Sequence, residues 1–183
     1  KRLIDVAEEL KPSVDDRDKI HILTLLGNIF SDLKRFEKAE MTYIESLEMI
    51  KKLREIYPTE YSLELAVTQN DLGALYISLT KFEDAEKNFL ESLQIYKKLG
   101  EENREDYEPS IARTQGNLGF LYMNLKDYNK AEEMSFNALK IFANLDKDIA
   151  DYYAEIQNFD KDVASYLQIL KDMGQLEYTL VLV

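Results

Sequence analysis

The sequence contains no cysteine, no tryptophan and a single histidine, and it has only 3 prolines and 6 glycines among 183 residues. Without cysteine, the chain can form no disulfide, no thiolate-ligated zinc site and no thiol nucleophile, and this composition suits a reducing compartment. The lone histidine, His21, cannot supply a catalytic pair. The scarcity of glycine and proline favours long helices joined by short turns.

The sequence also lacks an excess of basic charge and any long apolar run. Its formal net charge is −12 at pH 7, whereas a nucleic-acid-binding surface needs a basic patch to neutralise phosphates. No apolar run approaches the roughly 20 residues of a membrane-spanning helix, and the first residues show no charged-then-apolar signal segment. We therefore expect a cytoplasmic, soluble protein with neither a nucleic-acid nor a membrane partner.

Signatures of catalysis and of cofactor or metal binding are missing too. The patterns G-x-x-x-x-G-K-[ST], G-x-G-x-x-G, H-E-x-x-H and G-x-S-x-G do not occur in the sequence. The acidic segments 15–18 and 101–106 lack the bend glycine of a calcium loop, and we interpret them as solvated linkers. The sequence thus predicts no catalytic residue, no cofactor and no metal site, and hence no enzyme.

What the sequence does contain is an internal repeat with a period of 46 residues. The pair Leu26-Gly27 recurs as Leu72-Gly73 and as Leu118-Gly119 (73 − 27 = 46; 119 − 73 = 46). An alanine and a preceding aromatic residue keep the same spacing, at Ala39, Ala85 and Ala131 and at Phe36, Phe82 and Tyr128. Self-similarity over three copies is typical of an array of stacked units that cannot bury their apolar faces alone.

Each copy has the apolar periodicity of two helices separated by a short polar turn. In the second copy, apolar residues follow helical spacing before Thr80-Lys81 and again after it. The first helix of each unit, helix A, is predicted at 14–32, 60–80 and 107–125, and the second, helix B, at 37–56, 83–100 and 129–145. The predicted fold class is all-α: a right-handed α-solenoid of antiparallel helix hairpins, without a sheet.

The recurring glycine lies inside the predicted helix A, where glycine costs about 1 kcal/mol relative to alanine. We expect Gly73 to let helix B approach closely, with Ala85 supplying a matching small face. Prolines lie near the predicted starts of the A helices, where they are tolerated, and each is followed by a residue that we expect to cap the helix. These pairs are Pro12-Ser13, Pro58-Thr59 and Pro109-Ser110.

The repeated residues resemble the tetratricopeptide repeat, whose pattern is W-x2-L-G-x2-Y followed by A-x3-F. The second copy matches this pattern from Gln69 to Tyr76 and again from Ala85 to Phe89. The chain departs from it in lacking tryptophan and a closing proline, in having Ser135 at the last position of the third copy, and in its longer unit. The longer unit is similar to the long-repeat variety of kinesin light chains.

The resemblance implies a single tetratricopeptide-like array over residues 1–183. We expect its parts to be helix B of a preceding repeat at 1–11, repeats at 12–57, 58–103 and 104–147, and a degenerate terminal repeat or cap at 148–183. A further hypothesis is that the chain is a segment of a longer array and associates weakly with itself through the array ends.

In this family, five positions of each helix A line the concave groove of the superhelix. On this sequence those positions hold amides, small residues and an apolar trio of Ile77, Phe120 and Met123. Amides can pair with the backbone of an extended peptide, and apolar residues can hold its side chains; the alternative is that Phe120 and Met123 pack against the neighbouring unit. The resemblance therefore implies a ligand- or peptide-binding face of Asn28, Asn70, Ile77, Arg113, Asn117, Phe120, Met123 and Asn124.

These features predict a protein–protein interaction scaffold that binds a peptide or helix of a protein partner in its concave groove. A clamp for a C-terminal carboxylate is disfavoured, because Thr24 and Asp71 occupy positions at which such clamps carry a base or an amide. Two alternatives stay open: a self-association module, and a regulatory or accessory segment of a larger protein whose active domain lies outside this chain.

Overall fold

The computed structural model describes residues 15–57 and 59–144, and every regular element within them is an α-helix. In chain order these are α2 (Asp16–Asp32), α3 (Phe36–Ile56), α4 (Ser62–Ser78), α5 (Phe82–Leu99), α6 (Arg104–Asn124) and α7 (Tyr128–Asn144). The expected B helix at 1–11 and the expected terminal repeat or cap at 148–183 lie outside the described residues. Among the residues described, no helix is long and apolar enough to cross a membrane.

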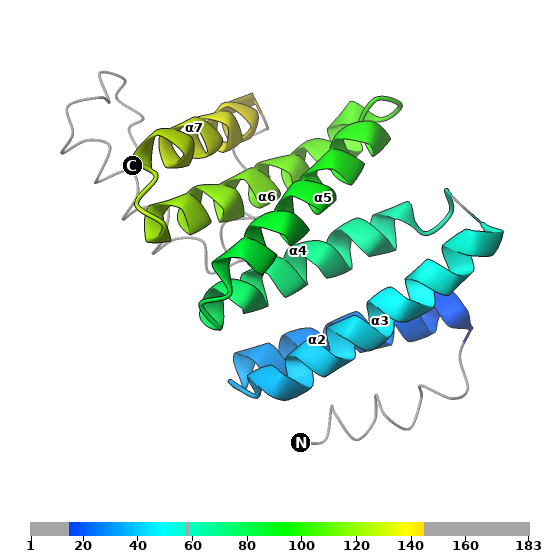
Figure 1. Cartoon of the computed structure of the whole chain (residues 1–183). Helices are drawn as coiled ribbons and strands as arrows, with labels where there is room; N and C mark the ends of the chain where they lie inside the picture. Colours follow the sequence, from blue (N-terminus) through cyan, green and yellow to red (C-terminus); the bar gives the residue numbers. More distant parts are fainter. Residues whose placement is uncertain (1–14, 58, 145–183) are drawn as a thin grey trace.

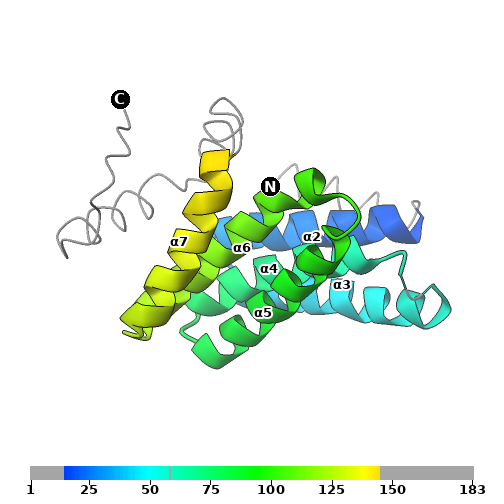
Figure 2. The same ribbon diagram turned by 90° about the horizontal axis from the view of Figure 1, so that it is seen from above.

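These helices form three antiparallel hairpins that stack one after another (Figure 1; Figure 2). The A helices α2, α4 and α6 pack on the B helices α3, α5 and α7 of the same hairpin. Between hairpins, α3 contacts α4, α5 contacts α6, and successive A helices also touch. The predicted all-α array of helix hairpins is confirmed, and the predicted helices agree with the observed ones to within a few residues.

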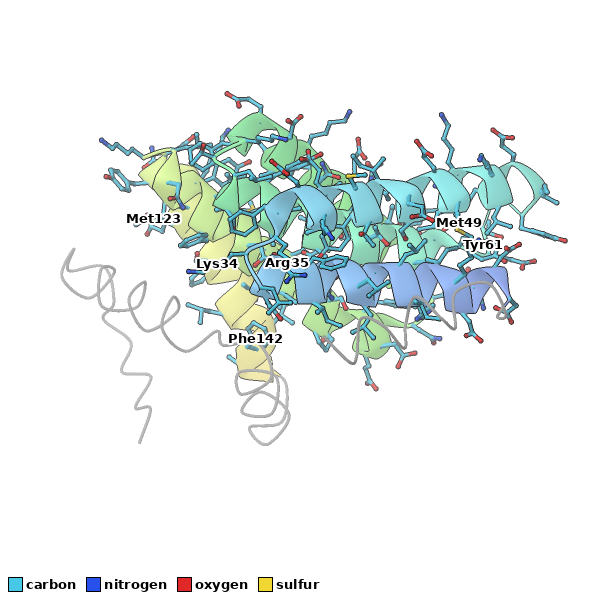
Figure 3. The ribbon with its side chains drawn as sticks, turned by 90° about the horizontal axis from the view of Figure 1, so that it is seen from below. Lys34, Arg35, Met49, Tyr61, Met123 and Phe142 are labelled. Atoms are coloured by element: carbon cyan, nitrogen blue, oxygen red, sulfur yellow. The ribbon has the colours of Figure 1, made fainter. Side chains whose placement is uncertain are left out.

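The turn inside each hairpin contains one residue with a left-handed backbone. Lys34, Thr80 and Lys126 have φ angles of 55°, 56° and 60° and lie one repeat apart. The next backbone N–H bonds back to a carbonyl near the end of helix A, as from Lys81 to Tyr76 at 2.9 Å. Each turn thus satisfies the last carbonyls of its A helix in the manner of a Schellman cap. Figure 3 shows Lys34 in this turn, at one end of the first hairpin.

The core forms two clusters, one at each junction between hairpins. In the first, Leu72 and Leu75 of α4 pack against side chains of α2 and α3, including Leu26 and Tyr43. In the second, residues of α6 pack in the same way against Phe89 and its neighbours on α5. Burying a large apolar side chain stabilises a fold by about 1.5–3 kcal/mol. Each hairpin therefore covers the apolar face of the one before it.

The recurring glycine does permit a close approach of helix B to helix A. A Cβ placed on Gly73 would lie 2.8 Å from the Phe89 ring, and one on Gly27 would lie 2.5 Å from the Tyr43 ring. Both rings are almost fully buried. The three atoms nearest to this Cβ on Gly73 belong to Phe89, while Ala85 is fully buried in the same core cluster, and its role as a matching small face stays a prediction. An aromatic ring fills the space above Gly27 and Gly73, and the small side chain of Ser135 fills it above Gly119.

The starts of the A helices differ from the expected proline-and-cap pattern. Pro109 lies inside α6, so Ser110 cannot cap it. Helix α6 begins earlier, at Arg104, and the acidic residues Glu105 and Asp106 in its first turn favour a helix N-terminus there. Helix α4 begins at Ser62, beyond Thr59, while Pro12-Ser13 and Pro58 lie outside the described residues.

One of the acidic segments has a structural role that the linker interpretation missed. The side chain of Asp15 accepts a hydrogen bond from the backbone N–H of Asp18 at 2.9 Å, which caps α2. Asp16 and Asp18 lie in the first helical turn, where negative charge is stabilised by the helix dipole. The 15–18 segment therefore begins the helix and is not a solvated linker.

Candidate functional site

The predicted site residues lie on the three A helices and reach the junctions between them. Asn28 is on α2, Asn70 and Ile77 are on α4, and the others are on α6. Because α2 touches α4 and α4 touches α6, residues one repeat apart approach each other along this side of the array. The predicted set divides into polar residues that mostly form hydrogen bonds or ion contacts within the protein and a smaller group that is exposed to solvent.

Asn70 is buried where α4 contacts α6 and forms hydrogen bonds between the two helices. Its side chain is 2% exposed. Its Oδ1 accepts hydrogen bonds from Thr114 Oγ1 at 3.2 Å and from Asn117 Nδ2 at 3.1 Å, and its Nδ2 donates to Asp71 Oδ1 at 3.3 Å. A buried polar group satisfied in this way positions its neighbours. Asn70 was predicted to contact a peptide directly, but the structure places it beneath the surface.

Asp71 is the residue of this region that the groove prediction left out. Burial raises the pKa of its carboxyl, while the Arg113 charge and hydrogen bonds from Asn70 and Asn28 lower it. Residues of all three A helices therefore act on one carboxylate. Asp71 falls outside the five groove positions, although it lies one repeat before Asn117, and that register was the available signal.

Asn28 extends the polar contacts to the first hairpin. Its Oδ1 accepts a hydrogen bond from the Tyr43 hydroxyl on α3. Burial, and then the charges of Asp71 and Asp32, raise the pKa of Tyr43 above its ordinary value, so the hydroxyl keeps its proton and remains a donor. We call the resulting set of connected residues the polar seam: Asn28, Asn70, Asp71, Arg113 and Asn117.

The apolar trio separates into two core residues and one exposed residue. Ile77 and Met123 are partly buried and pack against the core cluster around Phe89, which fits the alternative of packing for Met123. Phe120 is 40% exposed. Asn124, one turn further along α6, is exposed as well, and its Nδ2 donates to the Phe120 carbonyl at 2.8 Å. Phe120 and Asn124 thus form the most accessible part of the predicted site.

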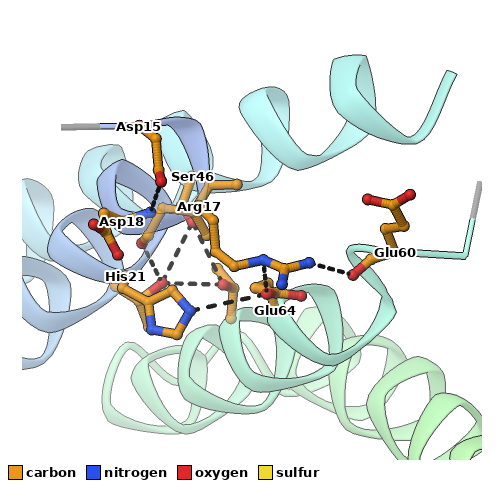
Figure 4. A network of polar contacts seen from close by, with 10 residues as sticks. Asp15, Arg17, Asp18, His21, Ser46, Glu60 and Glu64 are labelled. Atoms are coloured by element: carbon orange, nitrogen blue, oxygen red, sulfur yellow. Dashed lines mark hydrogen bonds and ion pairs between the residues drawn. The ribbon is translucent and has the colours of Figure 1, made fainter. Parts of the chain in front are cut away.

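A second polar joint connects the first two hairpins near the start of α2 (Figure 4). Arg17 Nε lies 2.9 Å from Glu64 Oε1, and its Nη2 donates to the Glu60 carbonyl at 2.9 Å. His21 is mostly exposed, with Nε2 3.9 Å from the same Glu64 oxygen. Glu64 is buried, so pairing with Arg17 offsets the cost of removing its charge from water. These contacts connect α2 to α4 and to the turn that precedes it.

Comparisons with known proteins agree with this architecture. A family model described as "Tetratricopeptide repeat" matches residues 16–98, and another with the same description matches residues 112–144. Among solved structures, the chain is similar to the crystal structure of BtubC (BKLC) from P. vanneervenii, with 24% sequence identity and a TM-score of 0.65. That match covers 93% of this chain and 74% of the other, and at this identity it concerns the fold alone. A search of the curated proteins finds no significant match.

Proposed function

The chain belongs to the tetratricopeptide repeat family, and we propose that it is a scaffold that binds an extended peptide or a helix of a partner protein on the A-helix side. Members of this family generally bind proteins and are typically non-catalytic. The observation that supports binding on this side is the polar seam, which connects the A helices of all three described hairpins.

The polar seam supports binding because it holds the surface above it in one conformation. Asn117 donates to a buried partner, and Asn28 is fixed by Tyr43. Side chains that are already ordered lose little entropy when a ligand arrives, so a preorganised surface gains affinity. In this proposal, Asn28 and Asn117 present their remaining amide atoms to the backbone of a bound peptide, while Asn70 keeps the helices in register.

Phe120 is the proposed anchor for an apolar side chain of the partner. It is a large aromatic residue, 40% exposed, on the last of the described A helices. Aromatic residues dominate the binding energy of many protein interfaces. Asn124 lies beside it and supplies a polar group at the edge of the contact. The partner segment that fits this arrangement has one apolar side chain next to a polar stretch of backbone.

The charges on this side disfavour a partner held mainly by its carboxylate. Arg113 is the basic residue of the polar seam, and its charge already acts on the carboxyl of Asp71. An incoming carboxylate would have to compete with this internal anion. In this proposal the partner segment is therefore neutral or weakly basic, and it does not depend on a terminal carboxylate.

The test begins with peptides selected from a random displayed library on the wild-type chain, followed by affinity measurements on purified variants. We expect Phe120→Ala to weaken the selected peptides by about tenfold, which corresponds to about 1.4 kcal/mol. Phe136→Ala is the matched control, because it removes an exposed phenylalanine from a B helix. If Phe120→Ala leaves every affinity unchanged while Phe136→Ala lowers them, the proposed site is wrong.

A further inference from the structure

We propose that Asp71 is the specificity-determining residue of the A-helix side and receives a lysine or arginine side chain of the bound peptide. This inference rests on the proposed function, which it refines by adding one basic position to the partner segment. Asp71 lies on α4, at the register that Asn117 occupies on α6 one repeat later (71 + 46 = 117). It is partly exposed, so a ligand on this side can reach its carboxylate.

The neighbours of Asp71 bind its carboxylate through amides and not through a direct ion pair. Asn70 Nδ2 donates to Asp71 Oδ1 at 3.3 Å, and the Asn28 side chain on α2 supplies a second hydrogen bond. None of the ion pairs that join described residues includes Asp71. Amide donors orient a carboxylate but carry no net charge. The Asp71 carboxylate is therefore held in position while its charge lacks a cation at contact distance.

Arg113 compensates the charge of Asp71 only in part. It acts on Asp71 from beyond ion-pair distance, and its charge acts on the Tyr96 hydroxyl as well. Burial is the largest influence on the Asp71 carboxyl and outweighs Arg113 and the two amides, so the pKa of this carboxyl stays above its ordinary value. The charged form therefore costs folding stability, and groups of this kind concentrate at functional sites. A second positive charge at contact distance would recover that cost when the peptide binds.

The charge of the whole chain favours the same partner chemistry. The formal net charge is −12 at pH 7, so the field around the protein attracts basic segments and repels acidic ones. Asp71 gives this general attraction one fixed position next to the proposed apolar anchor. Asn117, which is bonded to the neighbouring Asn70, lies one helical turn before Phe120 on α6. The basic and the apolar side chain of the partner should therefore bind at neighbouring points on the array.

The experiment is selection of a displayed random-sequence peptide library on the full wild-type chain and, in parallel, on Asp71→Asn. On the wild type we expect lysine or arginine to be enriched at one position near the apolar position. On Asp71→Asn this enrichment should be lost, while the apolar position should remain. Asp84→Asn is the matched control, because it removes the same charge from an exposed residue of the B helix α5. It should select the same kind of peptide as the wild type.

Affinities of one selected synthetic peptide, and of the same peptide with its basic residue replaced by glutamine, then measure the contact directly. The glutamine form should bind the wild type about tenfold more weakly, and it should bind Asp71→Asn as well as the basic form does. Salt screens a partly exposed charge pair, so the difference on the wild type should shrink at high ionic strength. Arg113→Gln should widen it, since the competing internal cation is gone.

The outcomes separate this inference from the proposed function. Selected peptides that lose affinity in Phe120→Ala but have no basic position would overturn the role of Asp71 and leave the proposed function intact. The role of Asp71 is also wrong if glutamine weakens the peptide equally on the wild type and on Asp71→Asn, because the basic side chain then contacts another group. A library that yields no binder on the wild type would overturn both proposals. Circular dichroism checks that each variant is folded.

Discussion

Replacing Gly73 by alanine tests whether the two helices of a hairpin meet as closely as the structure shows. In an exposed helix, this change would gain about 1 kcal/mol from the higher helix propensity of alanine. Here the new Cβ would lie 2.8 Å from Phe89 Cε1 and 2.9 Å from Phe89 Cδ1. The Phe89 side chain is fully buried and cannot move without displacing its neighbours. Overpacking of this kind costs about 1–3 kcal/mol, so we expect a net loss of up to about 2 kcal/mol.

The other glycines provide a graded series for the same urea-unfolding assay. Gly27→Ala should cost at least as much, since its Cβ would lie 2.5 Å from the Tyr43 ring. Gly119→Ala should cost less, because the nearest side-chain atom is the Ser135 hydroxyl, which can rotate away. Gly100→Ala is the mildest case: its Cβ would lie 3.2 Å from the Tyr96 carbonyl oxygen and 3.7 Å from the nearest side-chain atom, so its cost should be well below that of Gly73→Ala.

A double mutant identifies the contact responsible. In a Phe89→Leu background, the ring that meets the new Cβ is gone, so Gly73→Ala should become neutral or stabilising. The coupling between the two changes should therefore be clearly favourable. If Gly73→Ala stabilises the wild-type protein by about the helix-propensity gain of 1 kcal/mol, the close approach at this position is refuted.

Four further predictions concern the turn, the polar seam and the tyrosines. Thr80→Gly should stabilise the protein by about 0.5–1 kcal/mol in urea unfolding, because a β-branched residue at φ 56° is strained and glycine is not; a loss would contradict this. Asn70→Ala should cost about 1 kcal/mol, since it removes the acceptor of the partly buried Asn117 amide, while Thr114 keeps the Ser110 carbonyl as its acceptor; a loss below 0.5 kcal/mol would place it among ordinary surface changes. Asp71→Asn should raise the free energy of unfolding at neutral pH, because the pKa of the Asp71 carboxyl is higher in the folded protein than in the unfolded chain. This gain should vanish below pH 3.8, where the carboxyl is protonated in the unfolded chain too. A gain that persists below that pH would have another cause. Burial and Glu40 raise the pKa of Tyr76 from 10.0 to about 12, so its hydroxyl ionises in the unfolded chain before it does in the folded protein. The free energy of unfolding should therefore fall between pH 10 and 12, and it should fall less steeply in Tyr76→Phe.

The fold could be predicted from the sequence because packing repeats every 46 residues. The Leu-Gly pair and the aromatic residue after each turn recur wherever the same helix contact recurs, so three copies give the same answer. The left-handed turn could not be predicted in this way. Lys34, Thr80 and Lys126 have no strong preference for positive φ, and the packing of the two helices imposes that conformation on them.

The sequence indicates which helix carries each candidate residue but not how deeply that residue is buried. Family positions select residues of the A helices, and of these Phe120 and Asn124 are exposed. The sequence pattern placed Asn70 on a surface, yet it is buried where α4 contacts α6, and Thr114 and Asn117 donate hydrogen bonds to it there. Asp71 was missed because its surroundings come from three helices, and no local pattern encodes such a junction.

The most direct test of the central claim is hydrogen–deuterium exchange of the full chain with and without the tightest of the selected peptides. The account predicts that bound peptide slows exchange in α4 and α6, with the largest effect around Asn117 and Phe120, and leaves α5 and α7 nearly unchanged. Protection confined to the B helices, with α4 and α6 exchanging as in the free protein, would contradict it.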